Sequence, residues 1–146
     1  MTTAVSIAQR RTGPWTMADL LGVSPVADEA FLDLAESGIP LAKLQLLLDL
    51  GLTKAELHAL VIPPRTLSHR RALGVLNREE SDRLLRVLRS LTLAHQVFGA
   101  EDKALRWLRK PKSGLGGRTP LMALETETGA RLVEEWLIRI DSGMAA

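Results

Sequence analysis

Apolar residues recur at intervals of three and four along most of this chain, and that spacing gathers them on one side of a helix. The pattern is clearest after Asn77, which is followed three residues later by Glu80 in the manner of a helix-capping box. In this segment the apolar positions are Leu84, Val87, Leu88, Leu91, Ala94 and Phe98. Aromatic residues make up only 3% of the chain, so aliphatic side chains must form most of the core. We therefore predict an all-α protein.

Glycine, proline and capping residues divide this pattern into helices of modest length. We expect one turn of helix around residues 15–21 and helices over residues 28–36, 41–50, 54–60, 65–73, 77–98 and 102–109. Thr119 and Pro120 predict a short helix, Thr128 the start of the terminal helix, and Gly143 its end. The side chains expected in the core include Ala30, Phe31, Leu34, Ala35, Ala55, Leu57, Leu60, Val133, Trp136, Leu137 and Ile140.

Charge is distributed unevenly, although the whole chain carries a formal net charge of only +2. Residues 1–62 and 119–146 each sum to −3, whereas residues 63–89 sum to +4 and residues 103–118 sum to +6. Two basic segments therefore interrupt an otherwise neutral or acidic protein, and they are the candidates for contact with an anionic partner. In the longest helix, Arg83, Arg86 and Arg89 fall on or beside the side opposite the apolar face.

The residue patterns that support catalysis or metal binding are sparse. Cysteine is absent, and His58, His69 and His95 have no second ligand at a spacing typical of a metal site. No Gly-x-Ser-x-Gly elbow is present, and residues 113–117 lack the Gly-Lys-Ser/Thr of a phosphate-binding loop, so we interpret them as a structural turn. The sequence therefore predicts a protein that is not an enzyme and uses no metal or cofactor.

Hydropathy indicates where the protein resides. No apolar run approaches the roughly 20 residues that a membrane span requires, and residues 1–16 do not resemble a signal peptide. Together with the absence of cysteine, this predicts a cytoplasmic protein without a membrane partner. Residues 1–25 lack strong periodicity and contain Gly13-Pro14 and Ser24-Pro25, so we expect a flexible N-terminal arm.

Residues 54–73 predict a helix, a short turn and a second helix, an arrangement compatible with a helix-turn-helix unit. Pro63 and Pro64 break the chain between the two helices, and Pro64 suits the first position of the second. That second helix carries basic and polar side chains that can contact phosphates and base edges. The candidate DNA-binding residues are Arg65, Thr66, Ser68, His69, Arg70 and Arg71. A solvated helix face without a ligand is the alternative interpretation of the same residues.

A set of motifs in the second half of the chain carries a family resemblance. Its members are Arg71, Leu76, Glu80-Ser81-Asp82-Arg83, Ala104, Trp107-Leu108, Leu115-Gly116-Gly117, Thr119-Pro120, Gly129, Val133 and Leu137. In this combination the chain resembles the C-terminal domain of Xre/MbcA/ParS-type antitoxins, the partners of RES-domain toxins. The resemblance implies an N-terminal Xre-like helix-turn-helix domain and the capture of a toxin that consumes NAD.

The resemblance also implies where such a toxin would be bound. Most motif residues shape turns or the core, so we expect the contact to be made by exposed residues of the terminal helix and the nearby loop. These candidates are Arg118, Arg131, Glu134, Glu135, Arg139, Asp141 and Met144. Arg118, Arg131 or Arg139 is expected to occupy the position where an NAD phosphate would otherwise bind in the toxin.

We therefore predict three regions: a flexible arm at residues 1–25, an Xre-like helix-turn-helix domain at 26–75, and a toxin-binding domain at 76–146. The resemblance implies the antitoxin of a bacterial type II toxin-antitoxin system, which blocks the active site of a RES-domain toxin sterically. It also implies that the protein represses its own operon by binding operator DNA as a homodimer or higher oligomer. The alternatives are a stand-alone helix-turn-helix regulator without a toxin, and a scaffold whose basic segments bind acidic protein surfaces.

Overall fold

The computed structural model describes residues 16–22 and 28–143, and every regular element in these ranges is a helix. In chain order the elements are α1 (Met17–Leu21), α2 (Asp28–Ser37), η2 (Leu41–Leu44), α3 (Gln45–Asp49), α4 (Lys54–Leu60), α5 (Pro64–Arg70), α6 (Arg78–Phe98), α7 (Glu101–Leu108), η3 (Ser113–Leu115), α8 (Pro120–Ala123) and α9 (Glu127–Asp141). The predicted all-α class is confirmed. None of the helices in the described residues is long and apolar enough to cross a membrane.

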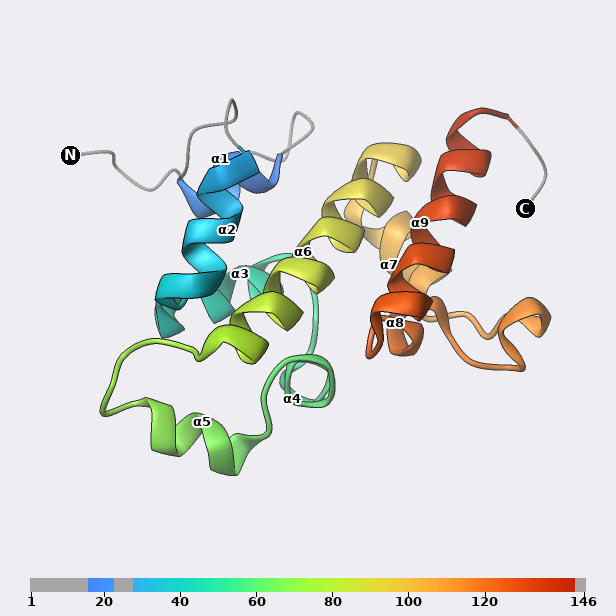
Figure 1. Cartoon of the computed structure of the whole chain (residues 1–146). Coiled ribbons are helices and arrows are strands. Elements are labelled where there is room, and N and C mark those ends of the chain that lie inside the picture. The colour runs from blue at the N-terminus through green and yellow to red at the C-terminus, as the bar shows by residue number, and fades with distance from the viewer. Residues whose placement is uncertain (1–15, 23–27, 144–146) are drawn as a thin grey trace.

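Helix α6, which has 21 residues, forms the centre of the fold. Figure 1 shows it running through the middle of the molecule, with α1 to α3 on one side, α7 to α9 on the other, and α4 and α5 below its N-terminal end. Its predicted capping box is present, because the Glu80 amide donates to Asn77 Oδ1 at 2.8 Å and the Asn77 amide donates to Glu80 Oε1 at 2.9 Å. Gly99 ends the helix in the left-handed conformation, with φ at 73°.

The predicted apolar face of α6 holds the two sides of the molecule together. Leu84, Val87, Leu88, Leu91 and Ala94 are all buried, and α6 packs against α1, α2 and α4 as well as against α7 and α9. A single apolar core, from Leu20 to Leu137, therefore extends through the described part of the chain. The predicted division at residue 76 falls just before this shared helix.

The turn after α2 is held against the segment that precedes α6. The Leu76 amide donates to Ile39 O at 2.9 Å, and the Ile39 amide donates to Ser81 Oγ at 3.0 Å. Gly38 precedes this contact with φ at 91°, and a Cβ there would lie 2.6 Å from Leu76 O. Glycine is required at this position because both the conformation and the close approach exclude a side chain.

Three expectations for α4 and the helices next to it are wrong, wholly or in part. The segment predicted as one helix over residues 41–50 begins as the 3-10 turn η2 before it becomes α3. Ala55, predicted in the core, is exposed. Leu57 and Leu60 occupy the buried side of α4, and Ala55 lies roughly 200° around the helix from Leu57, which places it toward solvent. Helix α5 ends at Arg70, so Leu73 lies beyond it.

The C-terminal helices follow the predicted capping signals with one shift. Thr119 caps α8 by accepting the Met122 amide at 3.2 Å, with Pro120 at the first helical position. The cap of α9 is Thr126, which accepts the Gly129 amide at 3.0 Å, so this helix starts at Glu127 and not at Thr128. Among the predicted inward residues of α9, Val133 and Leu137 are buried, whereas Trp136 and Ile140 are only half-buried.

Candidate interaction surfaces

Arginines of α6 bind the C-terminal helices. Arg86 donates through Nε to Glu127 Oε2 at 3.2 Å and through Nη1 to the Glu125 carbonyl at 3.0 Å. Arg89 forms ion pairs with Glu127, at 3.2 Å, and with Glu134. Glu134, a predicted toxin-binding residue, is therefore engaged within the chain and holds α9 against α6.

Two further arginines of the first basic segment also have partners. Arg70 donates to Glu80 Oε1 at 2.8 Å, and Glu80 is almost fully buried. Arg83 donates through Nη1 to Val61 O at 2.8 Å, which joins α6 to the end of α4. Within the described residues, Arg65, Arg71 and Arg78 of this segment form no ion pair and are exposed. The surface free to bind an anion is therefore smaller than the net charge of the segment indicated.

The six predicted DNA-binding residues do not share one face of α5. Ser68 and Arg71 line a groove of about 500 Å³ that is shared with η2, α3 and α4. Arg65 and His69 are exposed and are not among the residues that line this groove, and Arg70 binds Glu80. Thr66 is half-buried. Of the six predicted DNA-binding residues, the exposed ones with an arginine or histidine side chain are therefore Arg65, His69 and Arg71.

A second helix-turn-helix, which the sequence analysis did not single out, is formed by α3, the turn at residues 50–53 and α4. Gly51 gives this turn its sharp bend with φ at 100°, as is common between two helices joined in this way. The exposed residues of α4 include Lys54, Ala55 and Ala59. Small side chains on the second helix of such a unit allow close approach to a DNA groove, and alanine can contact a thymine methyl group. In the sequence, the signal for this helix-turn-helix is Gly51 followed by the Thr53–Glu56 capping box.

Arg109, at the end of α7, fastens that helix to the start of α4. Its guanidinium donates to both carboxylate oxygens of Glu56, at 2.7 and 3.0 Å, and to the Gly51 carbonyl at 2.9 Å. Glu56 at the same time closes the capping box of α4 by accepting the Thr53 amide at 2.8 Å. Burial raises the pKa of Glu56, but the hydrogen bonds from Arg109 and Thr53 outweigh burial and leave that pKa below its ordinary value.

This contact makes a prediction for Arg109→Ala. At pH 7 we expect the free energy of unfolding to fall by about 1 kcal/mol, the usual contribution of a partly exposed charged hydrogen bond. Because the pKa of Glu56 is lower in the folded than in the unfolded protein, its stabilisation is present above the unfolded pKa and is lost as pH falls through the folded pKa. The difference between the variant and the parent, measured by urea unfolding, should therefore shrink between about pH 5 and pH 3. Arg131→Ala is the exposed control, and an equal loss at pH 3 and pH 7 would contradict this assignment.

The outward side of α9 combines charge with apolar surface. Arg131, Glu135 and Arg139 are exposed at intervals of four, and Leu132 and Ile138 lie among them with 38% and 56% of their surface accessible. We call these five residues the α9 face. Leu132 and Ile138 are not among the predicted toxin contacts. Neither fits the buried 3-and-4 pattern of the helix, and this was the signal in the sequence that they are exposed. Asp141 is exposed at the end of α9, and Met144 lies outside the described residues.

Arg118 lies apart from α9, in the loop that precedes α8. It is exposed, and its Nη1 donates to the Leu115 carbonyl at 3.1 Å. The loop amides of Leu115, Gly116 and Gly117 donate to carbonyls of the same loop, at 3.0 Å each. These internal bonds support the interpretation of residues 113–117 as a structural turn.

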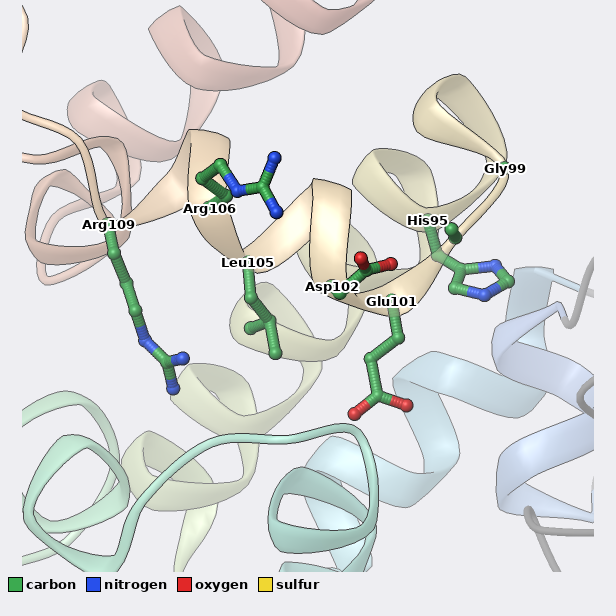
Figure 2. A pocket seen from close by; sticks show the side chains of 8 residues that line it. His95, Gly99, Glu101, Asp102, Leu105, Arg106 and Arg109 are labelled. Carbon is green, nitrogen blue, oxygen red and sulfur yellow. The ribbon is translucent and has the colours of Figure 1, made fainter.

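A pocket of about 630 Å³ lies between the end of α6 and α7. Figure 2 shows Glu101, Leu105 and Arg109 extending from one side of α7, while Arg106 extends from another and His95 comes from α6. Burial lowers the pKa of His95, and the negative charge of Glu101 acts in the opposite direction. No group of three or more potential metal ligands is found among the described residues.

Comparison with known protein families matches most of the chain. Residues 30–89 match the family described as the antitoxin Xre-like helix-turn-helix domain. Residues 93–143 match the family described as the antitoxin Xre/MbcA/ParS C-terminal toxin-binding domain. The chain belongs to the Xre antitoxin family. The two matched regions meet inside α6, and both the α3–α4 unit and the α5 residues lie in the first, whereas the α9 face lies in the second.

Two curated relatives of this Xre-family chain are each named Antitoxin Xre. A protein named Antitoxin Xre from Pseudomonas putida is 44% identical over 84 residues, which cover 57% of this chain and 53% of that protein. Another Antitoxin Xre, from Yersinia enterocolitica, is 42% identical over 97 residues, which cover 64% of this chain and 66% of the relative. The chain thus spans about half to two-thirds of the length of the relatives it matches.

Proposed function

We propose that this Xre-family chain is the antitoxin of a bacterial type II toxin-antitoxin pair. The observation that carries the proposal is the order of two matched regions in one chain, an Xre-like helix-turn-helix followed by a toxin-binding domain. A chain built in this way can bind DNA at one end and a protein at the other. Inhibition would be steric, with the antitoxin covering the active site of the toxin and performing no catalysis itself.

The proposed partner is a RES-domain toxin that degrades NAD, and the α9 face is the proposed contact. Leu132 and Ile138 supply the apolar anchors that protein interfaces favour at their centre. Arg131, Arg139 or, from the loop that precedes α8, Arg118 would place a guanidinium where the toxin binds a phosphate of NAD. Glu135 and Asp141 remain proposed contacts, whereas Glu134 would act indirectly through the ion pair that holds α9 to α6.

The proposed DNA target is the operator of the antitoxin's own operon. Lys54 on α4, Arg65 and His69 on α5, and Arg71 just after α5 provide cationic or imidazole groups on the exposed surface of the helix-turn-helix domain. One short recognition helix binds DNA weakly, so we propose a homodimer or higher oligomer that contacts two half-sites.

Co-expression with the adjacent gene product tests the antitoxin function directly. We expect the two proteins to co-purify, and NAD consumption by the partner to be lost in the complex. Failure to bind any neighbouring gene product, with sequence-specific DNA binding retained, would replace this proposal with a stand-alone transcriptional regulator.

The paired substitution Arg131→Glu and Ile138→Asp tests the α9 face. Both side chains are exposed, so the fold should persist, while reversed charge and loss of the apolar anchor should weaken toxin binding at least tenfold, or about 1.4 kcal/mol. The measurement is the dissociation constant of the complex and the inhibition of NAD consumption. Arg78→Glu, an exposed charge reversal in the first matched region, is the control; equal effects of the control and the pair would argue against this contact.

A further inference from the structure

The second basic segment contains a row of cations that the proposed toxin contact does not use. Lys103, Arg106 and Lys110 are exposed and form no ion pair within the described residues. The spacing of three residues places Lys103 and Arg106 on neighbouring positions of α7, and Lys110 lies in the turn that follows this helix. We call these three residues the α7 stripe. Residues 103–118 contain six basic residues and no acidic one, and the exposed Asp102, four residues before Arg106 on α7, is the carboxylate next to the stripe in sequence.

Arg109 determines where this stripe lies on the molecule. Its ion pair with Glu56 and its bond to the Gly51 carbonyl bring the end of α7 to the first turn of α4. In Figure 2, Arg109 extends from α7 on the side of the pocket with Leu105, whereas Arg106 extends from a different side of the helix. Lys110 follows Arg109 directly, and Arg106 precedes it by about one turn. The stripe therefore begins beside the N-terminal end of α4.

The N-terminal end of the second helix in a helix-turn-helix is the end that meets the base edges, with phosphates on either side of it. A row of cations beginning at that end is placed to meet the phosphate backbone next to the groove. The composition of the stripe also favours DNA over an acidic protein. Protein interfaces are depleted in lysine and depend on buried apolar anchors, whereas the stripe has three cations, with one exposed carboxylate, Asp102, beside them. Phosphate binding needs just such charges and no particular sequence.

We propose that the α7 stripe is a second phosphate-binding surface, so that the toxin-binding domain takes part in holding DNA. This inference rests on the proposed DNA binding of the helix-turn-helix domain. It adds that residues outside that domain contribute to affinity without contributing to sequence preference, because backbone contacts carry no direct sequence information.

The experiment compares the salt dependence of DNA binding for three forms of the full chain. The probes are a 30-base-pair duplex from immediately upstream of the coding sequence and a scrambled duplex of the same length. The stripe variant is Lys103→Gln, Arg106→Gln and Lys110→Gln. The control is Arg78→Gln, which removes an exposed charge outside the proposed DNA and toxin contacts. Fluorescence anisotropy at several salt concentrations gives the slope of log affinity against log salt.

For the stripe variant we expect the slope to fall by about 0.9 for each phosphate that it no longer binds, and affinity at physiological salt to drop about tenfold or more on both duplexes. The control should keep the slope of the parent. A stripe variant with the same slope as the control would overturn the inference while leaving the proposed function intact. Absence of DNA binding by the parent chain would overturn both, and failure of the stripe variant to co-purify with the toxin would assign the stripe to the protein partner. Each single substitution, at an exposed site, provides the same test if the triple variant is unstable.

Discussion

Gly129→Ala is expected to unfold the C-terminal helices or to destabilise the protein by at least about 3 kcal/mol, the scale of a severe steric conflict in a packed region. A Cβ at this position would lie 1.9 Å from Ala123 O and 2.8 Å from the Ala123 carbonyl carbon, both of them backbone atoms. If these atoms belonged to a flexible side chain, they could move away from the new Cβ. The backbone of the turn between α8 and α9 cannot, because Thr126 caps α9 there by accepting the Gly129 amide. Thermal and urea unfolding measure the effect.

The sign of this result separates packing from helix propensity. Alanine is favoured over glycine inside a helix by about 1 kcal/mol, so a stabilised Gly129→Ala variant would show that α9 does not approach α8 this closely. Thr128→Ala is the matched control, because Thr128 is exposed in the same turn of α9. We expect the control to change stability by less than about 0.5 kcal/mol.

Ser81→Ala has the second-largest expected effect, a loss of about 2 kcal/mol in the free energy of unfolding. Ser81 is fully buried, and its hydroxyl accepts the Ile39 amide at 3.0 Å across a separation of 42 residues. Alanine removes the acceptor and leaves a buried amide without its partner, which costs more than the bond itself contributes. The turn after α2 would lose one of the bonds that hold it to the start of α6. Urea denaturation measures the effect, and we expect a lower midpoint with an unchanged m-value.

Ser90 supplies a control in the same helix. It is also fully buried, and its hydroxyl has no hydrogen-bond partner in the described part of the chain. Ser90→Ala should therefore be neutral or stabilise the protein by up to about 1 kcal/mol, because an unsatisfied buried hydroxyl carries a desolvation cost. If both serine variants lose the same stability, the cause is the smaller side-chain volume in α6 and not the bond to Ile39.

The helices were predictable from the sequence to the extent that their signals are local. The capping boxes of α4 and α6 each join residues three apart, and glycine or proline follows most helices, so these boundaries required no knowledge of the fold. The predicted start of α9 is wrong by one residue because Thr126 and Thr128 are equally good caps in isolation. Thr126 is the cap in the folded chain, and the close approach of Gly129 to Ala123 beside it exists only after α8 and α9 have packed.

The roles of the arginines could not be predicted in the same way. Arg86 and Arg89 meet acids 38 to 45 residues away, and Arg109 meets Glu56 at a separation of 53 residues. No local pattern distinguishes these arginines from Arg65 or Arg106, which have no ion pair within the described residues. The sequence therefore located the two basic segments but could not show which charges the fold pairs internally and which it leaves for a partner.

The burial of side chains on α4 and α5 also could not be predicted from local spacing. Equal spacing on a helix predicts which residues share a side, but not which side faces the rest of the protein. Arg70 is predicted among the exposed cations, yet the buried Glu80 draws it inward. Ala55, assigned to the core for its apolar character, is exposed on α4 because a helix of seven residues can bury only one side.

Helix α6 belongs to both matched regions and has no flexible joint between them. A rod of 21 residues, about 30 Å long, fixes the angle between anything bound to the helix-turn-helix domain and anything bound to α9. If the chain binds DNA and a toxin as proposed, the bound toxin would project at a fixed angle around the double helix. The number of base pairs between neighbouring operators would then set whether two carried toxins face each other, since each base pair turns the second by about one-tenth of a revolution. The spacing of the operators would thus determine how the bound toxins are oriented relative to each other, because one continuous helix joins the two binding regions.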